Sequence, residues 1–264
     1  MLSPQAWGYY SSGADGERTM RETRSAFEAI KLKARAFAKA NSFSGLQTTI
    51  LGHAVSSPIC IAPTAMQRMG HPDGELATAR AAIKNGVAYG FSGWATTSYE
   101  ELQEGAPGGV KIGQFYATKS NEMNKDIFER MEKAGFVGIA VTCDTQILGK
   151  READERTGFS LPPHLSMRNL DKYIPADEMH GKGGSQGSQL ARYVREHKDN
   201  DFSWEKLRDL KKMTKLAVIV KGVQCAEDAR LAVEHGADAI WVSNHGARQL
   251  DTTPASIEVL EECV

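Results

Sequence analysis

The residues whose types and spacing could do chemistry gather near the end of the chain, in the stretch Ser-Asn-His-Gly-Ala-Arg-Gln-Leu-Asp at 243–251. His245 can take up a proton near neutral pH, and Arg248 can hold a carboxylate through two parallel hydrogen bonds. A base and a carboxylate clamp in one pocket suit proton abstraction from a small organic acid. On this stretch alone, a surface loop with an incidental histidine and arginine is an equal alternative.

A short apolar run at 239–242 precedes these polar residues, as expected where a buried parallel strand leaves the core. The same order of apolar strand, polar exit and helix repeats from Pro58 onward, which is typical of successive βα units. We predict six strands, at 59–63, 89–94, 111–116, 138–144, 217–221 and 239–244. Helices should begin near Asp73, Ser98, Ser120, Ser203 and Cys225, with another over 254–264.

Other parts of the chain precede or interrupt these units. Residues 1–57 form an N-terminal segment that is helical in character over 1–41, with a hairpin at 48–57 that could cap a barrel floor. Residues 145–202 separate the fourth strand from its helix and are rich in Gly, Ser, Lys and Pro. A connection of this length is usually functional or mobile, so we expect an inserted lid, with a disordered surface loop as an equal alternative. Residues 181–187 should be disordered without a partner.

The composition points to small-molecule chemistry. The chain has 264 residues, 41% of them hydrophobic, and a formal net charge of -1. It therefore lacks the excess of positive charge that favours binding to nucleic acid or to an anionic membrane. Its four cysteines lack metal-binding spacing and suit packed thiols in a reducing compartment, so no metal site is predicted. We find no apolar run near the roughly 18 residues of a membrane-spanning helix and no secretory signal. The expected protein is soluble and not secreted.

Every predicted strand exit offers a hydrogen-bonding group, which fits a barrel mouth holding a polar cofactor. The exits read Pro63-Thr64-Ala65, Ser92-Gly93-Trp94, Gln114-Phe115-Tyr116, Thr142-Cys143-Asp144, Lys221-Gly222 and Ser243-Asn244-His245. Asp144 could hydrogen-bond His245, fix its tautomer and stabilise the imidazolium formed on proton abstraction; otherwise it caps a loop. Lys221 ends an apolar strand, where a cation needs a phosphate, a carboxylate or an electron-rich ring as partner. Dinucleotide, P-loop and zinc-hydrolase motifs are absent from the sequence.

Together these residues resemble the FMN-dependent α-hydroxy-acid oxidase/dehydrogenase family, in particular its glycolate oxidase and 2-hydroxyacid oxidase members. The stretch 243–251 is similar to the family's active-site signature, and five further segments follow in the family's order. They are Tyr-Tyr-Ser-Ser-Gly-Ala at 9–14, Ala-Pro-Thr-Ala-Met-Gln at 62–67, Trp-Ala-Thr-Thr-Ser at 94–98, Gly-Lys-Arg-Glu at 149–152 and Leu-Pro-Pro at 161–163. The resemblance implies a TIM (β/α)8-type barrel, FMN as cofactor, and oxidation of a small (S)-2-hydroxy acid such as glycolate to the 2-oxo acid, with oxygen as acceptor.

The resemblance also implies a role for each matching residue. His245 would be the catalytic base with Asp144 as its partner, and Tyr116 would hydrogen-bond the substrate's hydroxyl or keto oxygen. The substrate would be held or shaped by Tyr9, Arg248, Arg151 and Trp94. FMN would contact Pro63, Thr64, Ala65, Ser92, Gln114, Thr142, Lys221 and Ser243, with the lysine stabilising the anionic reduced flavin. A peroxisomal location follows from the same resemblance, which also allows a homo-oligomer.

The chain departs from the family pattern near its C-terminal end. In the family, two more βα units follow, with Asp-Gly-Gly-x-Arg and Gly-Arg segments that receive the FMN phosphate. We therefore expect one domain, 1–264, whose barrel is truncated after the sixth unit. Missing phosphate contacts of about 1.5–3 kcal/mol each should weaken FMN binding, and open sheet edges should lower solubility. The alternative function is a catalytically inactive remnant that acts as an interaction module.

Overall fold

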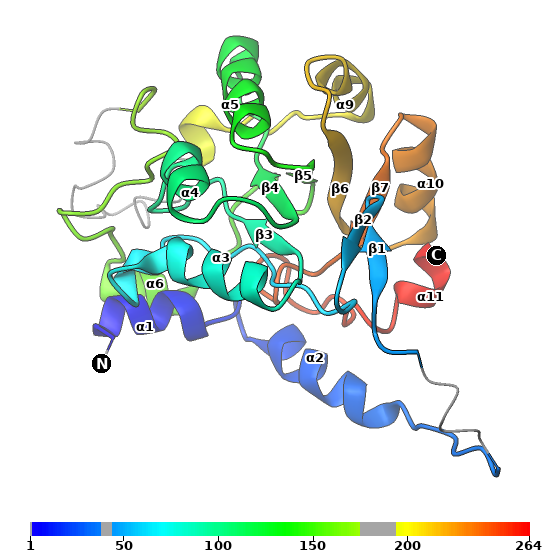
Figure 1. Ribbon diagram of the computed structural model, residues 1–264. Helices are drawn as coiled ribbons and strands as arrows, with labels where there is room; N and C mark the ends of the chain where they lie inside the picture. Colours follow the sequence, from blue (N-terminus) through cyan, green and yellow to red (C-terminus); the bar gives the residue numbers. More distant parts are fainter. Residues whose placement is uncertain (1, 38–43, 175–193) are drawn as a thin grey trace.

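The sheet at the centre of the molecule is parallel throughout, and its strands follow chain order. The structure is a computed structural model that describes residues 2–37, 44–174 and 194–264. The strands are β3 (Tyr89–Phe91), β4 (Lys111–Phe115), β5 (Gly138–Thr142), β6 (Ala217–Val223) and β7 (Ala239–Val242), paired in that order. The connecting helices lie around the sheet (Figure 1). This is the predicted α/β class, with the consecutive parallel strands of a (β/α) barrel.

Five helices begin where the sequence predicts them. They are α3 (Gly74–Lys84), α4 (Tyr99–Gly105), α5 (Asn121–Lys133), α9 (Trp204–Lys211) and α10 (Ala226–Glu234), with Asp73, Ser98, Ser120, Ser203 and Cys225 as N-caps. At α4 the capping box is complete, because Ser98 Oγ accepts from the Glu101 N–H at 3.1 Å and Glu101 Oε2 accepts from the Ser98 N–H at 2.7 Å. Side-chain capping thus marks the start of α4, α5 and α9, whereas Asp73 and Cys225 make no side-chain cap hydrogen bond.

The predicted strand boundaries need correction. The first predicted strand, 59–63, is only a single parallel bridge between Ile61 and Tyr89, because Pro63 has no N–H with which to continue the ladder. The strands predicted over 89–94, 111–116, 138–144 and 239–244 end earlier, where the chain turns into its polar exits. In the opposite sense, β6 runs past Lys221 to Val223, with a register shift between these two residues.

Two predicted helical segments are shorter than the sequence suggested. The helix predicted over 254–264 is only α11 (Leu260–Cys263), because Asn244 holds the preceding turn through its N–H to Ser256 Oγ at 3.0 Å and its Nδ2 to Pro254 O at 3.4 Å. The N-terminal segment contains α1 (Pro4–Ser11) and α2 (Arg18–Ala29), and residues 30–37 are not helical. Ile30 and Leu32 are exposed there, so no packing supports a longer helix.

The hairpin of β1 (Thr48–Ile50) and β2 (His53–Val55) pairs antiparallel. Its Ile50 and Leu51 pack against Ile112, Ala140 and Ile219 of the central strands. Since Ile112 lies near the start of β4, the hairpin covers the amino end of the sheet. The polar strand exits lie at the other end.

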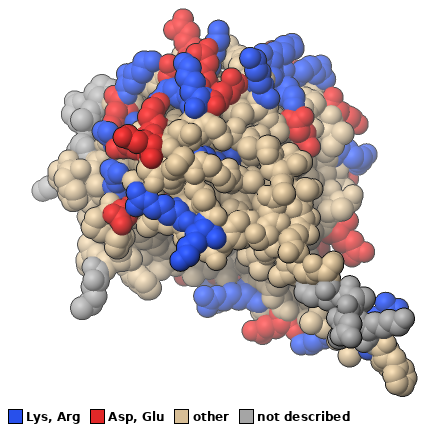
Figure 2. All heavy atoms as spheres, in the orientation of Figure 1, with Lys and Arg blue, Asp and Glu red and all other residues tan. Residues whose placement is uncertain are grey.

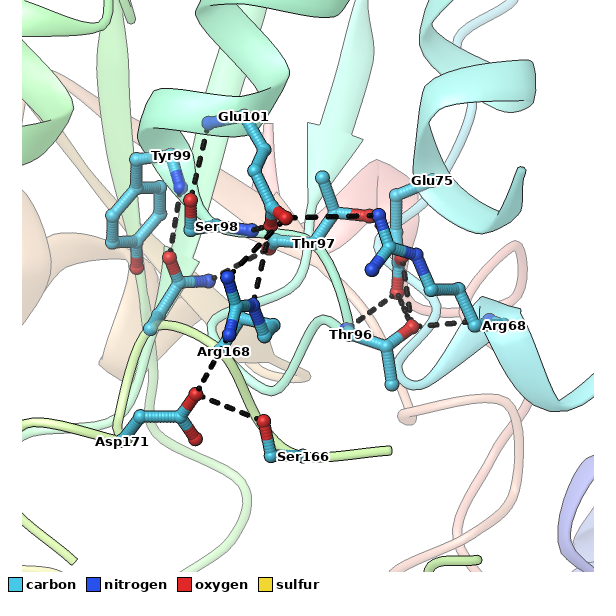
Figure 3. A network of polar contacts seen from close by, with 11 residues as sticks. Arg68, Glu75, Thr96, Thr97, Ser98, Tyr99, Glu101, Ser166, Arg168 and Asp171 are labelled. Carbon is cyan, nitrogen blue, oxygen red and sulfur yellow. Dashed lines mark hydrogen bonds and ion pairs between the residues drawn. The ribbon is translucent and has the colours of Figure 1, made fainter. Parts of the chain in front are cut away.

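The described parts of the insertion at 145–202 pack against the body of the protein. Its helix α6 (Glu152–Thr157) contacts α1 (Figure 1). Further along, Arg168 pairs with Glu101 of α4 at 3.3 Å and with Asp171 at 3.4 Å (Figure 3). The buried side chains of Phe159, Leu161, Met167 and Leu170 add an apolar contribution. The disorder predicted at 181–187 falls outside the described residues.

The surface carries charges of both signs. On the face shown in Figure 2, Lys and Arg side chains are intermixed with Asp and Glu side chains, in keeping with the formal net charge of -1. Among the described helices, none is long and apolar enough to cross a membrane.

Candidate active site

A pocket of about 310 Å³ lies at the carboxyl end of the sheet, where the polar exits meet. It has the size of an ordinary small-ligand pocket. Most of the predicted site residues line it: Tyr9, Pro63, Thr64, Ala65, Ser92, Trp94, Gln114, Tyr116, Arg151, Lys221, Ser243, His245 and Arg248. The other two, Asp144 and Thr142, do not line it but hydrogen-bond residues that do, namely His245 and Gln114.

Asp144 and His245 form a direct pair, with 2.7 Å between Asp144 Oδ1 and His245 Nδ1. They follow β5 and β7, so Asp144 must reach across the end of β6. Gly222 at the β6 bulge makes this approach possible: its φ is +115°, and a Cβ there would lie 2.7 Å from Asp144 Cβ. His245 itself has a left-handed φ of 57°, and its N–H donates to Ser243 Oγ at 3.0 Å. Such a conformation costs a non-glycine residue about 1–2 kcal/mol, which the surrounding contacts must offset.

The electrostatics of this pair favour a neutral imidazole beside an ionised carboxylate. Burial lowers the pKa of His245, although the hydrogen bond to Asp144 and its charge oppose that shift. Burial alone would raise the pKa of Asp144, but the hydrogen bond with His245 and the charges of His245 and Lys221 outweigh it, so the Asp144 pKa lies below its usual value. An ionised Asp144 can only accept, so Nδ1 of His245 carries the proton and Nε2 keeps a free lone pair.

Two arginines place positive charge in the same pocket. Arg248 Nη1 donates to Ser12 O at 2.6 Å, and its guanidinium carbon lies 4.9 Å from the ring centre of Tyr9. Arg151 is 5% exposed, and its one ion pair among the described residues, with Asp154, spans 4.0 Å. Burial, followed by the charge of Arg248, lowers the pKa of Arg151. Two cations this close to each other call for an anionic ligand.

Aromatic rings wall the pocket on the arginine side. Trp94 and Tyr116 stack with their ring centres 4.3 Å apart, and Tyr9 stacks on Phe159 of the insertion at 4.7 Å. Burial and the negative charge of Asp144 raise the pKa of Tyr116, so its hydroxyl stays protonated and can donate a hydrogen bond. The described part of the insertion therefore contributes to the site through Arg151 and Phe159.

The pocket also contains a chain of hydrogen-bonding groups and a buried lysine. Gln114 Nε2 donates to Thr142 Oγ1 at 2.9 Å, and Gln114 Oε1 accepts from Ser92 Oγ at 3.4 Å. Lys221 is 6% exposed and donates to Ser243 Oγ at 3.3 Å, with no ion pair in the part of the chain that the structure describes. Burial lowers the pKa of Lys221, although the charge of Asp144 opposes the shift.

The wall formed by Pro63, Thr64 and Ala65 is held by two residues that sequence reasoning missed. Tyr10 donates its hydroxyl to Met66 O at 2.7 Å. Glu75, which is fully buried, accepts from the main-chain N–H of Gln67 at 2.9 Å. It also accepts from the main-chain N–H of Thr96 at 2.9 Å (Figure 3). A glutamate near the start of a helix gives no sequence signal of such a role. Sequence reasoning also missed Gln249, which lies within the stretch 243–251 and accepts a hydrogen bond from Arg151 Nη2 at 3.3 Å.

Comparison with known proteins gives consistent matches over the whole chain. The profile of the FMN-dependent dehydrogenase family matches residues 1–264. Glycolate oxidase 1 of Zea mays is 45% identical over 263 residues, and glycolate oxidase of Spinacia oleracea is 46% identical over 263 residues. Each alignment covers 100% of this chain and 70% of the relative.

Solved structures give the same picture. A mandelate oxidase with (S)-4-hydroxymandelic acid superimposes with a TM-score of 0.91 at 33% identity, over 100% of this chain and 72% of that one. A protein described as a lactate oxidase of Pediococcus acidilactici superimposes with a TM-score of 0.88 at 30% identity, over 100% of this chain and 68% of that one.

Proposed function

The chain belongs to the FMN-dependent dehydrogenase family, and we propose that it oxidises a small (S)-2-hydroxy acid such as glycolate to the 2-oxo acid, with oxygen as the electron acceptor. The observation that carries this proposal is the convergence of a neutral base, His245, with the buried Arg151 and the half-buried Arg248 in one pocket. A 2-hydroxy acid presents a carboxylate for the cations and a hydroxyl and C–H for the base. The relatives named as glycolate oxidases support the choice of a short substrate.

The residues present fit FMN. Lys221 is a buried cation whose Nζ lies 5.8 Å from the ring centre of Trp241, the electron-rich ring among its predicted partners. It has no carboxylate in ion-pair contact among the described residues, so it can also serve a ligand that carries negative charge when reduced. Ser92, Gln114 and Ser243 offer donors and acceptors for a ring with both kinds of polar edge, and residues 63–65 line the same pocket. FMN, when bound there, supplies the electron sink that the protein's own side chains lack.

The protein's residues then divide the remaining work. Arg248 and Arg151, with the Tyr9 hydroxyl, hold the substrate carboxylate, and Trp94 limits the space beside it. Tyr116 donates its hydroxyl to the substrate's hydroxyl or keto oxygen. The free Nε2 of His245 takes the substrate proton, and Asp144 stabilises the imidazolium that forms because their 2.7 Å contact becomes an ion pair.

The test is reduction of bound flavin. The purified chain is loaded with FMN, freed of oxygen and mixed with glycolate, and the flavin absorbance is followed. Bleaching that disappears in His245→Ala, with FMN affinity retained, is the expected result. A chain that binds FMN but is not reduced by glycolate, lactate or mandelate would contradict the proposal and favour an interaction module.

Two further properties are proposed from family resemblance only. A peroxisomal location is tested by imaging a fluorescently tagged chain beside a peroxisomal marker, and diffuse signal would count against it. A homo-oligomer is tested by light scattering, where a monomeric mass would count against it.

A further inference from the structure

The side chain of Gln249 lies between the two loops that carry the charged residues of the site. It is 7% exposed and belongs to the loop after β7. Its Nε2 donates to Asp144 O at 3.1 Å and to Ile147 O at 3.0 Å. Its Oε1 accepts from Arg151 Nη2 and from the Gly149 N–H, each at 3.3 Å. Both amide hydrogens and both lone pairs of the oxygen are therefore in use.

These contacts join loops that the sheet does not join. The loop at 144–151 follows β5, and the loop at 243–251 follows β7, with β6 between the two strands. No backbone ladder can therefore set the position of one loop against the other. They approach very closely at Gly149, where a Cβ would lie 2.4 Å from Arg248 O, and Arg151 Nε also donates to Arg248 O at 3.3 Å.

We propose that Gln249 is a positioning residue, whose single amide sets the Asp144–His245 pair in register with the two arginines that receive the substrate carboxylate. The inference rests on the proposed function. The two ends of the Gln249 amide have separate roles. The donor end fixes the main chain of Asp144, and so the carboxylate that faces His245, while the acceptor end holds Arg151 beside Arg248 against their mutual repulsion.

Two substitutions separate these two contributions. Gln249→Leu keeps a similar size and removes all four hydrogen bonds. Gln249→Glu keeps an acceptor for Arg151 and the Gly149 N–H, but it replaces the donors by an oxygen that faces two carbonyl groups. The matched control is Gln146→Leu, an exposed glutamine on the same loop. Gly149→Ala pushes the loops apart without changing the amide, and it serves as an independent perturbation.

The measurements are kcat and KM for glycolate across pH, FMN affinity, and the NMR titration of the His245 imidazole. Gln249→Leu should lower kcat and raise KM, with a loss of about 100-fold in kcat/KM, as for a misplacement of roughly 1 Å. Gln249→Glu should lower kcat about tenfold and shift the His245 titration, with KM nearly unchanged because Arg151 keeps its acceptor. Gly149→Ala should lower kcat and raise KM as Gln249→Leu does. FMN affinity should not change, since Gln249 does not line the pocket.

Three outcomes would overturn the inference. The first is a Gln249→Leu protein that matches Gln146→Leu in kcat, KM and His245 titration. The second is equal effects of Gln249→Leu and Gln249→Glu on KM. The third is a loss of FMN affinity and Tm in parallel with activity, which would indicate a general structural role. If the FMN bound to the wild-type protein is not reduced by any 2-hydroxy acid, the proposed function fails. The His245 titration of the variants then still decides the role of Gln249.

Discussion

Asp144→Asn tests the electrostatics of the His245 pair while keeping its shape. The 2.7 Å contact is a charge-assisted hydrogen bond, worth about 1.5–3 kcal/mol, against roughly 0.5–1.5 kcal/mol for a neutral one. Loss of the charge therefore destabilises the imidazolium by about 1 kcal/mol or more, lowers the pKa of His245 further and slows proton abstraction about tenfold. If the asparagine turns its Nδ2 toward Nδ1 of His245, the imidazole proton moves to Nε2, and the loss grows to about 10⁴-fold.

The assay is the rate of flavin reduction by glycolate without oxygen, measured across pH. The rate should fall as the pH drops through the pKa of His245, because the protonated imidazole cannot accept the substrate proton. In Asp144→Asn this acidic limb should move to lower pH while the plateau falls. Asp171→Asn, which removes an exposed carboxylate paired with Arg168 away from the pocket, is the control. An unchanged limb and plateau in Asp144→Asn would refute the reasoning.

Three further outcomes are expected. Arg248→Lys loses bidentate carboxylate binding and should raise KM by about 10- to 100-fold, as assayed by flavin reduction, whereas Arg156→Lys on the exposed side of α6 should leave KM unchanged. Gly222→Ala drives a methyl group into Asp144 and should shift the His245 titration seen by NMR; Gly236→Ala, at a similar φ of +88° with open space, controls for backbone strain alone. Unfolding free energy from urea titrations should fall as the pH drops below 6.5, because the unfolded chain then binds a proton that native His245, with its lowered pKa, does not bind. A further loss should follow below pH 3.8, because the lowered pKa of Asp144 means that its ionised carboxylate stabilises the folded state, and this stability is lost as the pH falls through the folded-state pKa. An unfolding free energy that rises toward acidic pH would contradict both assignments.

Much of the fold was predictable because local chemistry decides it. The N-caps at Ser98, Ser120 and Ser203 each satisfy a free N–H of the first helical turn, and the side chain responsible is in the sequence beside it. The gathering of polar residues at strand exits was predictable too, since parallel strands bring their carboxyl ends to one edge.

The features that sequence reasoning missed depend on partners far along the chain. The turn before α11 is set by Asn244, which competes for the groups a longer helix would need. Gln249 meets groups about a hundred residues away, at 144–151. The need for glycine at the Gly222 bulge follows from the close approach of Asp144, which only the folded structure shows. None of these contacts has a local pattern of apolar spacing or capping residues.

The closure of the pocket by the N-terminal segment links folding to activity. Arg248 donates to Ser12 O, and the Ala14 N–H donates to Ala247 O at 2.9 Å, so residues more than two hundred positions apart share one wall of the site. Contacts of such sequence separation form late in folding, because the loop-closure entropy must be offset first. The central sheet can therefore be assembled before the pocket is closed. Transient fraying of α1 would then open the substrate site without unfolding the sheet, and hydrogen exchange at Ala14 would report on that local opening.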